Sequence, residues 1–89
     1  MRYFTEEKVA QLSSYATPFF YYDLKLLDDT LDAINHSIED TPFKVHYAIK
    51  ANANDEILER IKLKGFGIDC VSGNEVRKAI NSGFLAKNI

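Results

Sequence analysis

Residues 47–52, Tyr47-Ala48-Ile49-Lys50-Ala51-Asn52, place a lysine where a β-strand is expected to end. The apolar and β-branched residues from Val45 to Ile49 predict this strand, and its alternation puts His46, Ala48 and Lys50 on one face. A lysine that faces a protein interior is costly unless it is paired or neutral. A lowered pKa would prepare its amine to attack an aldehyde and form a Schiff base. The alternative is a strand-end lysine whose ammonium group reaches solvent.

Strands and helices alternate on both sides of this stretch. The further expected strands are 19–22 and 67–71, and a fourth is expected to begin at residues 87–89. The expected helices are 5–13, 24 to the break at Thr41-Pro42, 55–64 and 73–82. Strands that alternate with helices of this length predict an α/β fold with a parallel sheet. Because so few strands cannot close a barrel and would leave bare edges, we expect the chain to be part of a longer protein.

The helices should bury apolar stripes and expose polar ones. In the long helix the polar set is expected to face solvent: Lys25, Asp28, Asp29, Asp32 and Asn35. The buried positions expected in the last two helices are Ile57, Leu58, Ile61, Val76, Ala79 and Ile80.

Composition excludes several classes of protein. Eleven basic and 13 acidic residues are mixed along the chain, so no basic patch is available for nucleic acid. A single cysteine excludes an internal disulfide framework, and we expect no metal site. The longest apolar run, Phe19 to Tyr22, is far shorter than the roughly 20 residues that span a bilayer. Acidic residues also stand where a signal peptide would be apolar, so the expected location is the cytoplasm, without a membrane partner.

The lysine stretch resembles the Tyr-Ala-x-Lys-Ala-Asn signature of the alanine-racemase-like, fold-type III enzymes that use pyridoxal 5'-phosphate (PLP). Three more stretches are similar in the same order, namely 17–23, 65–75 and 81–84. The resemblance implies that Lys50 carries PLP covalently. The turn Val71-Ser72-Gly73-x-Glu75 is more similar to the diaminopimelate decarboxylases than to the ornithine enzymes of this group, although Asn74 departs from their usual glycine.

Three other residues join Lys50 in the expected site. Asp69 lies on the next strand, with a backbone expected about 5 Å from that of Lys50. The resemblance makes Asp69 a second catalytic residue beside the lysine, and makes Ala48, Asp69 and Glu75 cofactor-binding together with Lys50. For Asp69 the alternative is an acid satisfied by loop amides. For Glu75 it is a capping box, since Ser72 and Glu75 can satisfy each other's backbone amides. Tyr47 is assigned to packing.

The resemblance also implies a complete enzyme. Residues 24–89 would begin a PLP-binding (β/α)8 barrel, and the strand within residues 1–23 would join a C-terminal β domain. The enzyme would work as a homodimer on a small amino acid, converting meso-2,6-diaminopimelate to L-lysine. The 89 residues alone are expected to be inactive. Two alternatives stay open: a decarboxylase of ornithine, arginine or carboxynorspermidine, or a catalytically dead homologue that binds a partner.

Overall fold

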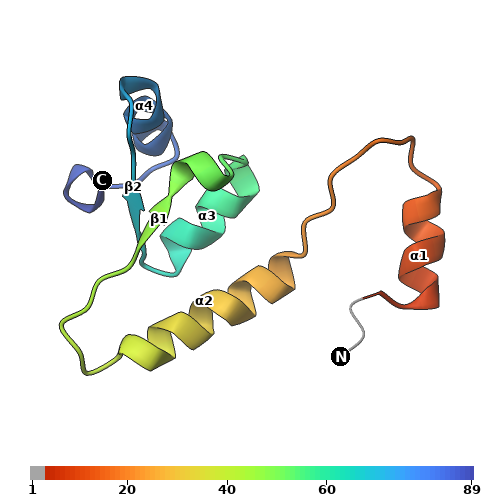
Figure 1. The fold of residues 1–89 in the computed structure, drawn as a ribbon, viewed down its shortest axis with the longest axis horizontal. Helices are drawn as coiled ribbons and strands as arrows, with labels where there is room; N and C mark the ends of the chain where they lie inside the picture. The colour runs from red at the N-terminus through yellow and green to blue at the C-terminus, as the bar shows by residue number, and fades with distance from the viewer. Residues whose placement is uncertain (1–3) are drawn as a thin grey trace.

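The computed structural model describes residues 4–89 and has α/β architecture (Figure 1). Its helices are α1 (Glu6–Ser13), α2 (Leu24–Ile38), α3 (Asp55–Leu63) and α4 (Gly73–Asn81), and its strands are β1 (His46–Ala48) and β2 (Gly67–Asp69). Two short 3₁₀ turns complete it, Ile49–Ala51 and Ala86–Asn88. The first of these is called the lysine turn below, because it contains Lys50.

The two strands form a parallel pair with α3 as the connection between them. The register pairs His46 with Gly67, Tyr47 with Ile68 and Ala48 with Asp69. Parallel strands need such a crossover, which confirms the expected βαβ arrangement and the α/β class. Both strands are shorter than the sequence predicted, since regular pairing stops where the chain bends into the lysine turn and into the loop before α4.

Local side-chain bonds begin each helix where the sequence predicted. Thr5, Asp23, Asn54 and Ser72 each accept a hydrogen bond from a backbone amide in the first turn of the helix that follows. Such caps satisfy amides that have no partner within the helix. Gly65 and Gly83 follow the ends of α3 and α4 with φ values of 84° and 96°, which glycine adopts without strain.

The core lies where α2, α3 and the two strands meet. Its buried members are Leu31, Ile49, Ile57, Leu58, Ile61, Phe66, Ile68, Ala79 and Phe84. The predictions for α3 are confirmed, since all three expected residues are buried. Two predictions for α4 were wrong, because Val76 and Ile80 remain 36% and 55% exposed. Ala79 alone reaches the core from that helix.

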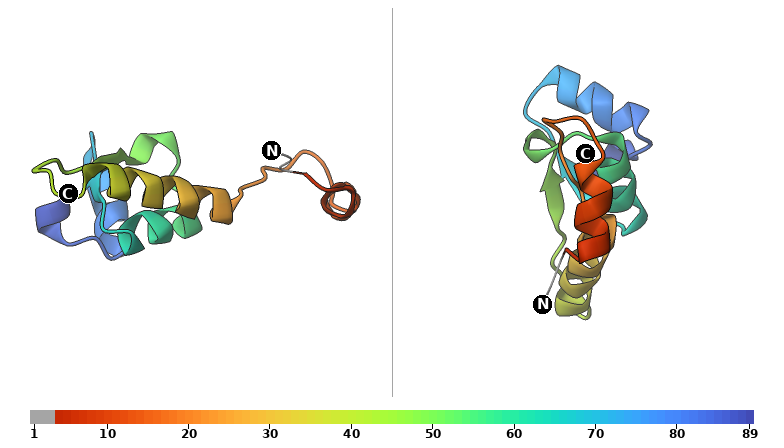
Figure 2. Two further views of the ribbon diagram at one scale, coloured as in Figure 1. Left: turned by 90° about the horizontal axis from the view of Figure 1, so that it is seen from below. Right: turned by 90° about the vertical axis from the view of Figure 1, so that its right-hand side faces the viewer.

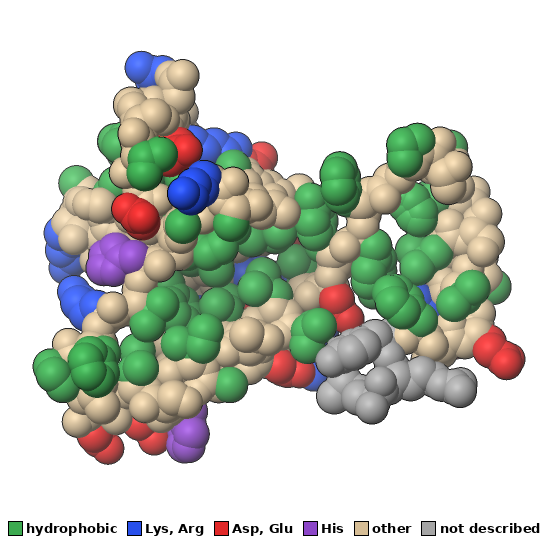
Figure 3. Space-filling model, in the orientation of Figure 1, with side chains coloured by type: hydrophobic (Ala, Val, Ile, Leu, Met, Phe, Trp, Pro, Cys, Tyr) green, Lys and Arg blue, Asp and Glu red, His purple; other side chains and the backbone are tan. Residues whose placement is uncertain are grey.

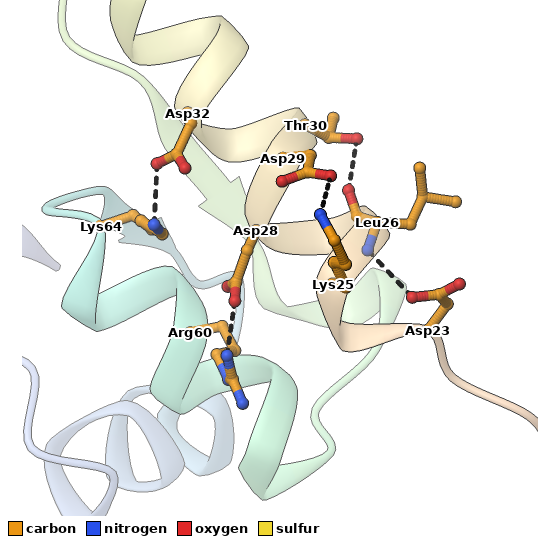
Figure 4. A network of polar contacts seen from close by, with 9 residues as sticks. All are labelled: Asp23, Lys25, Leu26, Asp28, Asp29, Thr30, Asp32, Arg60 and Lys64. Atoms are coloured by element: carbon orange, nitrogen blue, oxygen red, sulfur yellow. Dashed lines mark hydrogen bonds and ion pairs between the residues drawn. The ribbon is translucent and has the colours of Figure 1, made fainter.

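The polar residues of α2 do not all face solvent as expected. Asp28 pairs with Arg60 of α3 at 2.5 Å, and Asp32 pairs with Lys64, just after α3, at 2.8 Å (Figure 4). Asn35 donates a hydrogen bond to the carbonyl of Lys64 at 2.9 Å. This face of α2 therefore joins α2 to α3 by polar contacts beside the apolar core.

The segment before α2 differs most from the expectation. Residues 19–22 form no strand, because among residues 4–89 they pair with no other strand. This segment separates α1 from the rest of the fold in Figures 1 and 2, and its aromatic side chains line a hollow together with side chains of α1. Hydrophobic side chains gather around this part of the molecule in Figure 3. Residues 86–88 form a 3₁₀ turn instead of starting a fourth strand. The expected domain 1–23 includes residues 1–3, which lie outside the described residues.

None of the helices described between residues 4 and 89 is long and apolar enough to cross a membrane.

Candidate cofactor site

Lys50 lies on the lysine turn, immediately after β1. The alternation that placed its side chain on the face of Ala48 therefore does not apply, because a 3₁₀ turn has three residues per turn and not two. Lys50 is exposed, and within residues 4–89 it forms no ion pair. Its neighbour Ile49 is buried in the core. The turn thus holds its backbone against the core while the amine stays accessible.

The far end of the lysine turn is fixed by Tyr47. Its hydroxyl donates a hydrogen bond to the carbonyl of Asn52 at 2.8 Å. The side-chain oxygen of Asn52 accepts from the amide of Asn54 at 2.9 Å, and Asn54 caps α3. The sequence assigned Tyr47 to packing and missed this contact. No pattern could have indicated it, since the acceptor is a backbone carbonyl that every residue carries.

Asp69 is the last residue of β2 and is exposed. The register places it opposite Ala48, which is half-buried, and Lys50 follows two residues later. Lys50 and Asp69 therefore occupy the carboxyl ends of neighbouring parallel strands, but they form no ion pair with each other among the described residues. The structure brings the two chain segments together without bringing the two charges into contact.

Glu75 lies in the first turn of α4 and is half-buried. Its amide donates to the hydroxyl of Ser72 at 3.1 Å, and its carboxylate accepts from the amide of Val71 at 2.8 Å. The helix cap that was the alternative for Glu75 is thus present. Its carboxylate accepts from the amide of Val71, one residue before the amide of Ser72 that the usual capping box uses. Because α4 packs against the lysine turn, Glu75 belongs to the same end of the fold as Lys50.

Cys70 separates Asp69 from this cap and packs partly against the core. Burial raises the pKa of its thiol, and the nearby carboxylates of Glu75 and Asp69 add to the effect. The thiol is therefore held in its neutral form.

These residues fit a cofactor that carries an aldehyde and a phosphate. Lys50 supplies an accessible amine at the carboxyl end of β1, and Asp69 supplies a carboxylate at the same end of β2. Ala48, which pairs with Asp69 at the end of β1, adds little bulk to the sheet. The amino end of α4, which carries partial positive charge, lies next to this edge. In parallel α/β folds, ligands bind at the carboxyl ends of the strands.

Comparison with known proteins defines the class. Residues 24–89, more than half of the chain, match the pyridoxal binding domain of the pyridoxal-dependent decarboxylases. The chain belongs to this family, whose cofactor is PLP.

Several curated relatives carry one particular name. The chain is 54% identical over 74 residues to the diaminopimelate decarboxylase of Bacteroides thetaiotaomicron, covering 82% of this chain and 19% of that protein. It is 30% identical over 73 residues to the diaminopimelate decarboxylase of Campylobacter jejuni, covering 82% and 18% of the two chains. A probable chloroplastic diaminopimelate decarboxylase of rice, Oryza sativa, is 37% identical over 68 residues, covering 76% and 14%. The chain thus spans less than a fifth of the length of these relatives, and no solved structure matches it.

Proposed function

We propose that the chain is the cofactor-binding start of a PLP-dependent decarboxylase that converts meso-2,6-diaminopimelate to L-lysine. The observation that carries the proposal is the position of Lys50: an accessible amine on a turn anchored to the core, beside the carboxyl end of β2. Bound PLP supplies an electron sink for the charge that develops when carbon dioxide leaves.

The residues of this chain would hold and orient that group. Lys50 would bind the aldehyde carbon through its amine nitrogen. The carboxylate of Asp69 would attract the lysine ammonium, so that its role is to orient the amine and to hold a proton on it, not to lower its pKa. Ala48, opposite Asp69, would leave space for the cofactor ring.

Glu75 would act in a different way from Asp69. Its carboxylate already bonds the amide of Val71, which fixes the loop between β2 and α4. In this proposal Glu75 holds the amino end of α4 beside the lysine turn and adds a negative charge near the cofactor lysine. It would be a positioning residue for the site.

The architecture of the complete protein is also part of the proposal. The βαβ unit of β1, α3 and β2 would begin a (β/α)8 barrel. The segment 19–22, which has no strand partner among the described residues, would join a C-terminal β domain. The enzyme would be a cytoplasmic homodimer acting on a small amino acid.

The names of the relatives support diaminopimelate as the substrate, and the turn from Val71 to Glu75 agrees with them. A decarboxylase of ornithine, arginine or carboxynorspermidine is the competing assignment, and the proposed test separates them. A catalytically dead homologue that acts by binding a partner would release no carbon dioxide from any of these amino acids.

The test begins with the attachment of the cofactor in the complete protein. Borohydride reduction followed by peptide mapping should find reduced PLP on Lys50, and Lys50→Ala should lose it. Lys44→Ala is the matched control, since Lys44 is exposed and precedes the same strand. Reduced PLP on Lys44 or Lys25 would overturn the proposal.

Substrate choice needs a second measurement. Carbon dioxide release from meso-diaminopimelate should be far faster than from ornithine, arginine or carboxynorspermidine. Equal or reversed rates would move the assignment to the polyamine enzymes, and no release from any of the four would indicate a homologue without this activity.

A further inference from the structure

The lysine turn is short and gains little stability from its own hydrogen bonds. It contains three residues, Ile49–Ala51, and hydrogen bonds in 3₁₀ helices have poorer geometry than those in α-helices. Two contacts compensate. The side chain of Ile49 is buried in the core on the strand side, and the hydroxyl of Tyr47 bonds the carbonyl of Asn52 just after the turn. Because Lys50 lies between these two contacts, they fix the position of its backbone.

We propose that Tyr47 is a positioning residue for Lys50: its hydroxyl closes the lysine turn and holds the amine where the cofactor must meet it. The bond runs from Tyr47, in the middle pair of the β1–β2 ladder, to Asn52, whose side chain accepts from the amide of Asn54, the cap of α3. It therefore links the strand, the turn and the helix around one lysine. The inference rests on the proposed attachment of PLP to Lys50.

Burial keeps the bond available. Tyr47 is half-buried and packs against the core, and it lines one hollow together with Tyr22 and Ile57. Burial raises the pKa of Tyr47, so the hydroxyl keeps its proton and remains a donor at the pH values at which enzymes of amino-acid metabolism work. The carbonyl of Asn52 would otherwise lose its partner in a half-buried position.

The expected effect is on the encounter between the amine and the cofactor. Without the hydroxyl, the exit of the turn is held only by the side chain of Asn52, and the backbone of Lys50 samples more positions. Misplacement of a reacting group lowers the rate at which it meets its partner. One net hydrogen bond corresponds to about a three- to tenfold change in an equilibrium constant.

The test compares Tyr47→Phe with Tyr22→Phe in the complete protein freed of cofactor. Phenylalanine keeps the ring and removes only the hydroxyl. Tyr22 lines the same hollow as Tyr47, and its hydroxyl takes no part in the bond to Asn52. Three quantities are measured: the dissociation constant for PLP, the rate at which the visible absorbance of bound PLP appears, and hydrogen–deuterium exchange in residues 49–54.

We expect Tyr47→Phe to bind PLP about three- to tenfold more weakly, to form the visible band more slowly by a similar factor, and to exchange faster in residues 49–54. Tyr22→Phe should match the wild type in all three. If Tyr47→Phe lowers only the melting temperature, or changes none of the three quantities, Tyr47 has a structural role and the inference is wrong. If the wild type itself forms no bond between Lys50 and PLP, the proposed function fails first and the inference falls with it.

Discussion

Replacing Asp28 by asparagine should destabilise the protein more than the same change at a neighbouring aspartate. Asp28 on α2 pairs with Arg60 on α3 at 2.5 Å, with exposed fractions of 23% for the aspartate and 37% for the arginine (Figure 4). Two charges about 4 Å apart attract by roughly 4 kcal/mol at an effective dielectric constant of about 20. The cost of removing both groups from water offsets much of this. Exposed pairs contribute about 0–1 kcal/mol and the loss of one buried partner costs about 3–5 kcal/mol, so we expect about 1–2 kcal/mol here.

The second oxygen of Asp28 limits the expected loss of stability, because a buried carboxylate oxygen without a partner already destabilises the wild type. This oxygen is buried and accepts no hydrogen bond from residues 4–89. Asparagine has the same shape, so Asp28→Asn removes the charge without opening a cavity. The matched control is Asp29→Asn, because Asp29 pairs with Lys25 on the exposed side of the same helix.

Urea unfolding of the complete protein, followed through its first cooperative transition, measures both changes. Asp28→Asn should lower the midpoint clearly, and Asp29→Asn should change the free energy of unfolding by less than about 0.5 kcal/mol. In 1 M salt, where charges are screened beyond about 3 Å, the small effect of Asp29→Asn should vanish and most of the effect of Asp28→Asn should remain. Equal effects of the two variants, or the loss of both in salt, would refute the view that Asp28 and Arg60 form a partly buried link between α2 and α3.

Three further outcomes are expected of the complete protein. Leu58→Ala should lower the free energy of unfolding by about 2–5 kcal/mol in urea titrations, whereas Leu63→Ala, at an exposed position of the same helix, should change it little. Ser72→Ala should cost about 1 kcal/mol by the same measurement, since the hydroxyl of Ser72 caps α4, and Ser72→Thr should retain most of the stability. Iodoacetamide should alkylate Cys70 at pH 8 more slowly than it alkylates a cysteine in an unfolded peptide, because the raised pKa of the Cys70 thiol leaves less thiolate. Mass spectrometry of the labelled protein measures the two rates, and equal rates would contradict the prediction.

The sequence predicts those parts of the fold that depend on near neighbours. Helix starts were predicted from single residues such as Asp23 and Asn54, because a cap and its amide lie within three residues of each other. The parallel order of β1 and β2 followed from the alternation of strands and helices. Lys50 and Asp69 were expected at neighbouring strand ends; Asp69 ends β2, and Lys50 lies on the turn two residues after the end of β1.

Features that depend on distant partners could not be predicted in the same way. The segment 19–22 has strand-forming residues, but a strand exists only with a partner, and residues 4–89 give it none. Asp28 resembles a solvated helix residue until Arg60, 32 positions later, is brought against it. The 3₁₀ turn at Lys50, which interrupts the alternation of side chains between the two faces of the strand, could not be predicted, since its residues also suit a strand. The contact of Tyr47 was missed for a related reason, because its acceptor is main chain.

The accessible position of Lys50 separates the chemistry proposed for this residue from the stability of the fold. The side chain of Lys50 is exposed and forms no ion pair with the described residues, while the neighbouring Ile49 carries the packing. A substitution at Lys50 therefore removes the amine and leaves the core intact. If Lys50 holds PLP as proposed, one mutation could inactivate the protein without unfolding it, and natural selection would keep the lysine only as long as the reaction is needed. In the laboratory, a folded variant that lacks the amine of Lys50 can serve as the negative control for every experiment on the cofactor.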